Sequence, residues 1–477
     1  MLRRMFRFAR PCLLAALVSL APLASGAGPA APPLTPAERG AIIDALRANC
    51  DPSSGEAIKF ADSGLLEAVS EAAEAELAQR VRPSDVDRAW AYDPPRHDIA
   101  AELAAARAAG RLGAWLKSLS PSDPRYRALI AARCRYQAMT WSGGWRPLPA
   151  GLRVSLGEQR PDVKLLRQRL AAEGYLPRQA TASVTFDESV QRALRSFQQR
   201  HGLAANGLVD RKTLAALNVS AEARLQQIEV NLERWRWLAR PLPANRAEVD
   251  VAAAQMTLYR DGVPALTMRA IVGDPRHHTP LFTAPRLQAV VFNPPWNVPD
   301  SIARAEILPK AAKNPGYLAR ENMTFVDGRL QQRPGPKNSL GQLKIDFPSP
   351  FGVYLHDTPA KSLFGRAVRA LSHGCMRLEK PRELAAALLA NQGWTAERID
   401  AAIAQGATQR VELKGAPPLF VIYTTAEADA SGVVTFRPDP YGWDDRLKAA
   451  LAPSLASDIR VRAATANGDV EPGQFGP

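Results

Sequence analysis

The chain has 477 residues, which is too long for one hydrophobic core and indicates about three domains. Hydrophobic residues make up 46% and charged residues 23%, a balance that excludes a disordered or collagen-like chain. The formal net charge is +14, yet the basic residues are scattered and form no aromatic-basic stripe of the RNA-binding kind, so we expect no nucleic-acid partner.

The first 26 residues have the pattern of a secretory signal peptide. A basic stretch is followed by an apolar run from Cys12 to about Leu23 and by small residues at 24–27. The apolar run is too short to span a bilayer. We therefore expect a cleaved leader over 1–26, a periplasmic location and no membrane span in the mature chain. Loss of the leader's four arginines leaves a net charge of +10, which favours an anionic wall polymer or membrane surface as a partner.

Three cysteines remain after the leader, namely Cys50, Cys134 and Cys375. In an oxidising compartment an odd number predicts one disulfide and one free thiol. Cys50 and Cys134 are the natural pair, with two unpaired buried thiols as the alternative. Cys375 is then the reactive thiol.

Residues 35–150 are predicted to form a helical scaffold domain. Thr35-Pro36-Ala37-Glu38 supplies a capping threonine, a proline in the first turn and a carboxylate at the third helical position. Alanine- and leucine-rich helical stretches follow, including 100–119. No chemistry of its own is expected in this region.

Residues 153–222 have the pattern of three short helices, with a turn at Asn206-Gly207 before the third. This unit resembles the peptidoglycan-binding module of wall hydrolases and transpeptidases, through that turn and through Phe197, His201-Gly202-Leu203 and Thr213-Leu214. The resemblance implies binding to wall glycan, or a packing surface as in some copies. We predict that His201 is a structural residue at a helix end.

A linker helix is predicted over 223–245, followed by a mainly β domain over 246–452. Strands are expected at 248–252, 256–260, 268–272, 289–292, 419–423 and 433–437, and helices at 382–391 and 445–451. Asp261-Gly262 predicts a hairpin turn. Such spacing favours a β-sandwich, so the predicted fold class is α+β.

A polar, proline-rich insertion over 298–347, with a helical stretch at 302–308, interrupts these strands. It lies between an aromatic strand region and the segment that holds the candidate site. We predict that it forms a lid, with a plain surface excursion as the alternative. The polar stretch 453–477 is expected to be a flexible tail.

The candidate site consists of His356 and the stretch from Ser372 to Leu378, which contains Cys375. A thiol attacks a carbonyl as thiolate, so a nucleophilic cysteine needs a base or a positive field beside it. His356 ends a predicted strand that starts at Phe351, and we expect it to ionise Cys375 and later to return the proton to a leaving amine. The alternative is a small buried hydrophobic cysteine beside a core histidine.

Two further residues are expected to help at this site. Gly374 frees neighbouring amides to face a developing oxyanion. Tyr354 lies two residues before His356, hence on the same strand face, and offers a hydroxyl donor. These residues together predict acyl transfer through a thioester.

This motif resembles that of the L,D-transpeptidases of bacterial cell walls: a histidine, a spacer, then Ser/Thr-His-Gly-Cys and a basic residue. The resemblance implies Cys375 as nucleophile and His356 as proton donor and acceptor. It implies supporting roles for Ser372, His373, Gly374 and Arg377. Asp357 stands where some members place a serine, which leaves the third member of the triad open, with a backbone carbonyl as a candidate.

Other stretches resemble the larger multidomain periplasmic branch of that family. They are Asn231 to Trp237, Gly273-Asp274-Pro275, Thr279-Pro280 and Asn293 to Pro299. The resemblance implies 3-3 cross-linking of peptidoglycan stem peptides and acylation by carbapenem-type inhibitors. Two alternatives remain, a cysteine L,D-carboxypeptidase or wall-peptide hydrolase that uses the same residues with water, and a non-catalytic wall-binding scaffold.

We expect no cofactor. His277-His278 is the one adjacent histidine pair in the sequence, but no third ligand follows at metal spacing, so we interpret it as part of a loop.

Overall fold

The computed structural model describes residues 32–48, 50, 61–77 and 80–452. The predicted leader over 1–26 and the predicted tail over 453–477 lie outside these residues. Within the described ranges, no helix combines the length and the apolar character that a membrane crossing requires.

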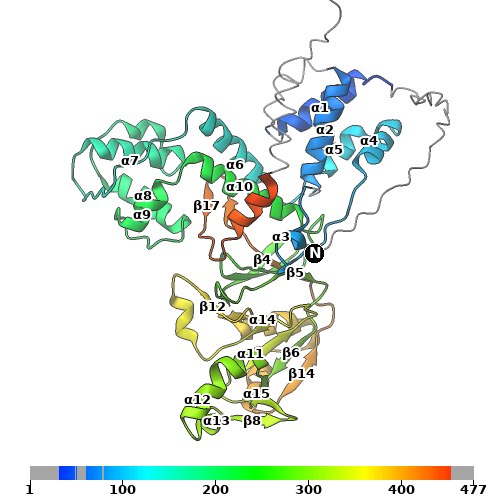
Figure 1. The fold of residues 1–477 in the computed structure, drawn as a ribbon, viewed down its shortest axis with the longest axis vertical. Helices are drawn as coiled ribbons and strands as arrows, with labels where there is room; N and C mark the ends of the chain where they lie inside the picture. Colours follow the sequence, from blue (N-terminus) through cyan, green and yellow to red (C-terminus); the bar gives the residue numbers. More distant parts are fainter. Residues whose placement is uncertain (1–31, 49, 51–60, 78–79, 453–477) are drawn as a thin grey trace, which may run out of the picture.

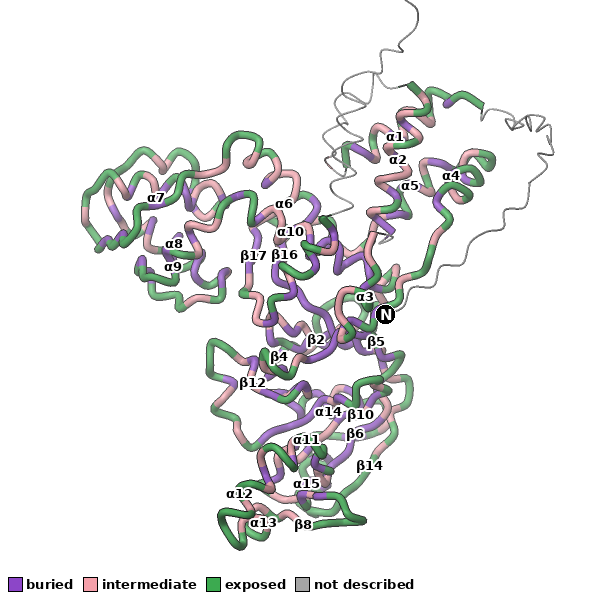
Figure 2. The backbone as a smooth tube through the Cα atoms, in the orientation of Figure 1, coloured by how far each residue is buried: buried purple, intermediate pink, exposed green. Residues whose placement is uncertain are grey.

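The described chain is a mixed α+β structure, as the sequence predicts. Two helical parts, one with α1, α2, α4 and α5 and the other with α7 to α9, lie on opposite sides of α6 and α10 (Figure 1). The strands lie below α6 and α10, and the insertion with α11 to α13 lies at the far end. The central strands and α10 are largely buried, whereas the outer parts of the insertion are exposed (Figure 2).

The first helical part has its own core. Its helices are α1 (Pro36–Ala48), α2 (Asp62–Glu76), α3 (Pro83–Val86), α4 (Ile99–Ala108) and α5 (Leu112–Ser118). The predicted start of α1 is confirmed: Thr35 Oγ1 accepts from the Glu38 amide at 3.2 Å, and the Glu38 carboxylate accepts from the Thr35 amide at 2.8 Å. The core between these helices runs from Leu34 to Leu119.

Helix α6 (Pro124–Trp141) follows in sequence but packs with α10 and the main sheet. It lies along α10 (Ala221–Arg236), and its buried Tyr126, Leu129 and Tyr136 belong to the same core as the sheet. A disulfide between Cys50 and Cys134, with Cα atoms 5.4 Å apart, joins it back to the first helical part. The predicted pairing of these cysteines is therefore confirmed.

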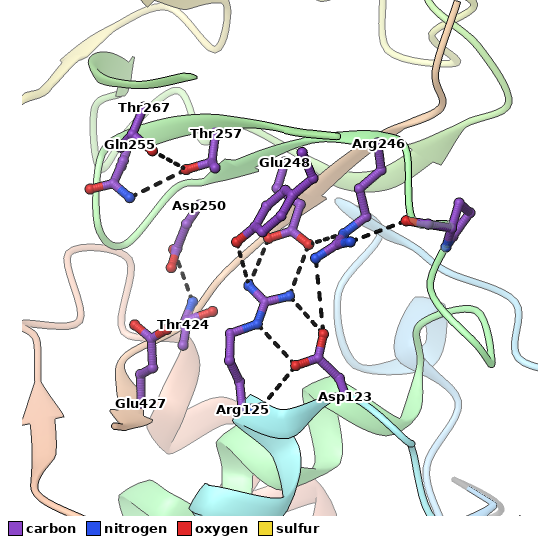
Figure 3. Close-up of polar contacts among 12 residues, drawn as sticks. Asp123, Arg125, Arg246, Glu248, Asp250, Gln255, Thr257, Thr267, Thr424 and Glu427 are labelled. Carbon is purple, nitrogen blue, oxygen red and sulfur yellow. Dashed lines mark hydrogen bonds and ion pairs between the residues drawn. The ribbon is translucent and has the colours of Figure 1, made fainter. Parts of the chain in front are cut away.

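The start of α6 is fixed to the sheet by a cluster of paired charges (Figure 3). Arg125 donates to both carboxylate oxygens of Glu248, at 2.8 and 3.0 Å, and also binds Asp123. Arg246 donates to Glu248 at 2.6 Å from the other side. Because these charges neutralise one another, the cluster is suited to holding α6 in place rather than to chemistry.

The three-helix unit consists of α7 (Pro161–Ala172), α8 (Glu188–Arg200) and α9 (Arg211–Leu217), with a 3-10 turn at Arg178–Thr181. Asp187 caps α8 and Asp210 caps α9 through their side chains, as expected at helix starts. The unit has its own apolar core around Leu166, Leu194 and Phe197.

This unit is docked firmly on α6 and on the β16–β17 hairpin (Ala426–Ala428 and Val434–Phe436). Arg169 and Glu173 form an ion pair of 2.6 Å at 1% and 2% side-chain exposure, and Tyr136 of α6 donates to Glu173 at 2.8 Å. The His201 ring stacks on Phe197 at 3.8 Å and faces Phe436 at 5.7 Å. Burial lowers the pKa of His201 to about 3, consistent with the predicted structural role.

The strands form one twelve-stranded hydrogen-bonded path in the order β1-β5-β15-β2-β3-β4-β13-β11-β10-β6-β14, with β12 beside β4. Their bounds are β1 Trp90–Ala91, β2 Arg246–Asp250, β3 Gln255–Arg260, β4 Val263–Gly273, β5 Leu281–Ala284, β6 Ala289–Phe292, β10 Leu343–Asp346, β11 Leu355–His356, β12 Ala370–Ser372, β13 Met376–Leu378, β14 Gln409–Glu412 and β15 Leu419–Ile422. The predicted hairpin joins β3 and β4, with positive φ at both Asp261 and Gly262. Strand pairing alone does not fix which faces pack together, so the sandwich stays a prediction.

Helices α14 (Pro381–Leu389) and α15 (Ala396–Ala404) follow β13, and 443–452 is helical at the end of the described chain. The insertion forms a small unit with its own core. It contains α11 (Asp300–Ile302), a π-helical turn (Ala303–Ile307), α12 (Leu308–Lys313), α13 (Tyr317–Arg320) and a three-stranded sheet of β7 (Trp296–Asn297), β9 (Arg329–Gln332) and β8 (Met323–Val326). Val298, Ala303, Ile307 and Leu330 are buried within it.

Candidate active site

Two short parallel strands bring the candidate base and nucleophile onto one face. In β11 and β13, Leu355 pairs with Met376 and His356 with Arg377, and the Met376 amide donates to the Tyr354 carbonyl at 3.2 Å. Side chains alternate along a strand. Cys375 and Arg377 therefore share a face with His356 and Tyr354. Cys375 falls opposite Tyr354, two residues before Arg377, which pairs with His356.

Tyr354 and Trp296 of β7 act on the site through hydrogen bonding. The amide and the hydroxyl of Tyr354 each lower the pKa of the Cys375 thiol, and Trp296 lowers the pKa of Tyr354. Burial raises the pKa of the Cys375 thiol, and these two bonds together with the positive charges of Lys344 and Arg377 lower it without offsetting burial. The resting residue is therefore a thiol at neutral pH.

His356 is a buried neutral imidazole. Its Nδ1 lies 2.6 Å from the carbonyl oxygen of Asp357, and because a carbonyl can only accept, Nδ1 carries the proton and Nε2 keeps its lone pair. Burial, with a contribution from the Arg377 charge, lowers the pKa of His356 to about 3. Because burial disfavours both charges, the resting pair is neutral, and the expectation that His356 takes the thiol proton and later returns it stays a prediction.

This contact favours the backbone carbonyl, the candidate for the third triad member that the sequence left open. The group that orients His356 is the backbone carbonyl of Asp357, whereas the Asp357 carboxylate accepts from the Gln342 amide at 2.9 Å and pairs with Lys361 at 2.5 Å. Within the described residues no hydrogen bond joins the imidazole to the sulfur of Cys375. Such contacts are often long in resting enzymes and shorten when substrate binds.

The turn before Cys375 is held by its own side chains. Ser372 Oγ donates to the Cys375 carbonyl at 2.5 Å and accepts from the Gly374 amide at 3.2 Å. Gly374 has φ of +101°, and a Cβ added there would lie 3.3 Å from the His278 carbonyl oxygen. Both facts require glycine at this position.

His373 points away from the sulfur and toward the insertion. Its Nε2 lies 2.5 Å from Glu306 Oε1 in the π-helical turn, and its ring is 4.5 Å from that of His277. His277 in turn contacts Asp274 at 3.0 Å. Over the described residues no three potential ligands are grouped as a metal site.

Two cations flank the sulfur. Arg377 is partly buried, and its Nε has no hydrogen-bond partner among the described residues. Lys344 of β10 pairs with Asp346 at 2.8 Å, and its Nζ lies 4.4 Å from the centre of the Tyr354 ring. A positive field at a half-buried nucleophile suits an anionic substrate.

The sequence did not single out several residues that the fold brings here. Trp296 lies within the stretch from Asn293 to Pro299, which carried part of the family resemblance. The sequence therefore pointed to this stretch but not to the interaction of Trp296 with Tyr354. No local pattern marks Lys344 or Glu306, because both reach the site through tertiary pairing.

Comparison with known proteins finds three matching domains and a curated relative. Residues 244–405 match the L,D-transpeptidase catalytic domain, residues 159–217 a putative peptidoglycan binding domain, and residues 34–132 a scaffold domain. A putative L,D-transpeptidase of Haemophilus influenzae is 31% identical over 308 residues, covering 58% of this chain and 62% of the relative, which is less than two thirds of its length.

Solved structures give weaker likenesses. An L,D-transpeptidase from Mycobacterium smegmatis is 20% identical, with 38% of this chain and 60% of that one covered and a TM-score of 0.21. L,D-transpeptidase 3 from Mycobacterium tuberculosis, solved with a faropenem-derived adduct, is 15% identical, with 38% and 62% covered and a TM-score of 0.21. By these matches the chain carries an L,D-transpeptidase (YkuD) family domain over residues 244–405, together with a peptidoglycan-binding domain and an N-terminal scaffold domain.

Proposed function

We propose that this protein is a periplasmic L,D-transpeptidase that forms 3-3 cross-links between peptidoglycan stem peptides through a thioester on Cys375. The observation that supports this most is the shared face of Cys375 and a neutral His356 in the β11–β13 pair. A free, half-buried thiol that shares a strand face with a neutral imidazole is an arrangement that acyl transfer can use.

In the first half-reaction, Cys375 attacks the carbonyl that joins the third stem residue to a terminal D-alanine. His356 Nε2 takes the thiol proton as the carbon–sulfur bond forms, and the carbonyl oxygen becomes an oxyanion. The carbon–nitrogen bond then breaks, and His356 returns the proton to the departing D-alanine amine. The product is a thioester between the shortened stem and Cys375.

In the second half-reaction, the side-chain amine of a diaminopimelate residue from another stem attacks the thioester. His356 takes the amine proton and gives it to the sulfur as the carbon–sulfur bond breaks. One amide bond replaces another, so no external energy source is required. The neutral resting pair fits this route, because the imidazole must accept a proton before it can donate one.

The surroundings of Cys375 support a wall peptide as substrate. Stem peptides carry several carboxylates, and Lys344 and the partly unpaired Arg377 provide cationic partners for them. The insertion over 298–347 reaches the nucleophile turn through Glu306 and His373, which fits a lid over the bound peptide. The peptidoglycan-binding domain then supplies wall polymer to the same enzyme.

The test is to incubate the purified protein with disaccharide tetrapeptide and to identify products by mass spectrometry. We expect 3-3 dimers and free D-alanine from the native chain, and neither from Cys375→Ala. Release of D-alanine without dimers, in the presence of an acceptor stem, would instead identify a carboxypeptidase or hydrolase.

Matched variants separate catalysis from folding. His356→Gln should abolish dimers, whereas His97→Gln, in the scaffold domain, should not. Sedimentation with insoluble peptidoglycan should be unchanged in Cys375→Ala. Full dimer formation by Cys375→Ala would refute the thioester mechanism, whereas the absence of dimers and of free D-alanine from the native protein would favour the non-catalytic scaffold. A carbapenem should add its mass to the native protein and not to Cys375→Ala, because its strained carbonyl acylates the same sulfur.

A further inference from the structure

The peptide bond that precedes the nucleophile is held from behind by Thr279. This side chain is fully buried, and its Oγ1 lies 2.8 Å from the Gly374 carbonyl oxygen and 2.8 Å from the Gly273 amide nitrogen. The Gly273 amide can only donate, so the one hydroxyl proton of Thr279 must go to the Gly374 carbonyl. The direction of this hydrogen bond is therefore fixed by the contacts.

Fixing that carbonyl also fixes the amide on the other side of the same peptide. In a planar trans peptide, the carbonyl of Gly374 and the amide of Cys375 point in opposite directions. With the carbonyl tied to Thr279 in the interior, the Cys375 amide faces away from Thr279. An amide beside its own nucleophilic sulfur is well placed to donate to the oxyanion that forms when the sulfur attacks.

Thr279 is in turn held by Tyr441. The Tyr441 hydroxyl donates to the Gly273 carbonyl at 2.6 Å and accepts from the Thr279 amide at 3.3 Å. Burial raises the pKa of Tyr441 to about 12, so it remains a donor at neutral pH. Its ring is also fixed, because it stacks on His278 at 4.3 Å and meets Trp443 edge-on at 4.8 Å.

The turn between these contacts has no room to adapt. A Cβ added at Gly273 would lie 2.0 Å from the His277 carbonyl oxygen, so the chain from 273 to 279 is folded tightly on itself. Tyr441 follows β17 and lies outside residues 244–405, which match the catalytic-domain model. The nucleophile turn is thus supported by a segment near the C-terminal end of the described chain.

We propose that Thr279 and Tyr441 are positioning residues, which orient the Gly374–Cys375 peptide so that the Cys375 amide is aimed at the oxyanion of the acyl-transfer step. This rests on the proposed function only for the identity of the acyl donor. Neither side chain touches substrate, and both act through the backbone that they hold.

The experiment compares two reactions of the same thiol. Acylation by a carbapenem passes through an oxyanion, whereas alkylation by iodoacetamide does not. For Thr279→Val, we expect acylation of Cys375 to slow by about 10- to 100-fold, somewhat less than the loss of a whole oxyanion donor. Alkylation should stay within about twofold of the native rate. Thr279→Ser keeps the hydroxyl and should restore acylation.

Tyr441→Phe keeps the stacked ring and removes the hydroxyl, so it serves as the second variant if Thr279→Val fails to fold. We expect slower acylation with normal alkylation. Tyr175→Phe is the matched control, since the Tyr175 hydroxyl bonds the Val434 carbonyl in the docked three-helix unit. Acylation at the native rate in folded Thr279→Val or in Tyr441→Phe would overturn the proposal, as would equal losses in both reactions.

The stem donor separates this proposal from the proposed function. If the native protein is acylated by the carbapenem but not by tetrapeptide, the proposed substrate is wrong while the positioning role is still tested. If tetrapeptide acylates native protein and Thr279→Val equally fast, the function stands and the positioning role is refuted.

Discussion

The ionisation of Cys375 leads to a prediction that separates a neutral resting pair from a preformed thiolate and imidazolium. The experiment measures the rate at which iodoacetamide alkylates Cys375 as a function of pH, in the native protein and in Tyr354→Phe. Burial raises the thiol pKa above its usual 9.0 and lowers that of His356 to about 3. The native alkylation rate should therefore rise about tenfold per pH unit up to at least pH 9.

The hydrogen bond from the Tyr354 hydroxyl sets the expected size of the change in the Cys375 thiol pKa. A hydrogen bond to a charged group is worth about 1.5–3 kcal/mol, and one pKa unit corresponds to about 1.36 kcal/mol. Its loss should raise the thiol pKa by about 1–2 units. Because nucleophilicity rises with thiol pKa at a Brønsted slope of about 0.4–0.5, the net loss of rate at pH 7 should be about 3- to 16-fold.

The assay is intact-mass spectrometry of the alkylated protein at timed intervals, with Tyr175→Phe as the matched control and thermal unfolding to confirm folding. A rate that levels off between pH 5 and pH 8 would refute the neutral pair, because it would show a thiolate at neutral pH. An unchanged rate in Tyr354→Phe would show that the hydroxyl does not stabilise the sulfur.

Three further predictions follow from single contacts. Gly374→Ala places a side chain on a backbone with φ of +101°. This variant should lower the free energy of unfolding by about 1–3 kcal/mol and slow acylation of Cys375 at least tenfold. A variant with native stability and full activity would contradict this prediction. Glu173→Gln breaks the buried pair with Arg169 and should cost about 3–5 kcal/mol in chemical denaturation. Burial raises the pKa of Glu173, but nearby charges, that of Arg169 first, hold this pKa at about 2. The ion pair therefore stabilises the native protein above pH 4.5, and this stabilisation is lost as the pH falls towards 2. Glu173→Gln should lack this pH dependence of stability, and equal pH profiles for the two proteins would contradict the prediction. Glu306→Gln weakens an exposed contact with His373 that is worth about 0.2–1 kcal/mol. If the insertion is a lid, this change should speed alkylation of Cys375 by no more than about fivefold. Slower alkylation would contradict the lid.

Local patterns predicted the elements whose causes are local. The capping residues at Thr35 and Glu38, the Asp261-Gly262 turn and the strand at Ala289–Phe292 all appear where the sequence places them. The strand predicted from Phe351 to His356 is shorter, Leu355–His356, because Gly352 has φ of +66° and breaks the extended backbone.

Features that depend on distant parts of the chain were not readable from the sequence. Trp90 and Ala91 pair with β5, far along the chain, and no periodicity marks a two-residue strand. Helix α6 has an ordinary helical pattern but packs on α10 rather than in the first helical core. The burial of His356 and the packing of Cys375 against the sheet core come from neighbours on several strands, which no local pattern reports.

The measurement that tests the central claim most directly is rapid quenching of the native protein with tetrapeptide stem donor, followed by mass spectrometry of the peptide that contains Cys375. We expect a covalent adduct equal to the donor less D-alanine, which disappears when acceptor stem is added and which His356→Gln forms far more slowly. Cross-linked product from native protein with no adduct on Cys375 at any time, or from Cys375→Ala, would contradict the account.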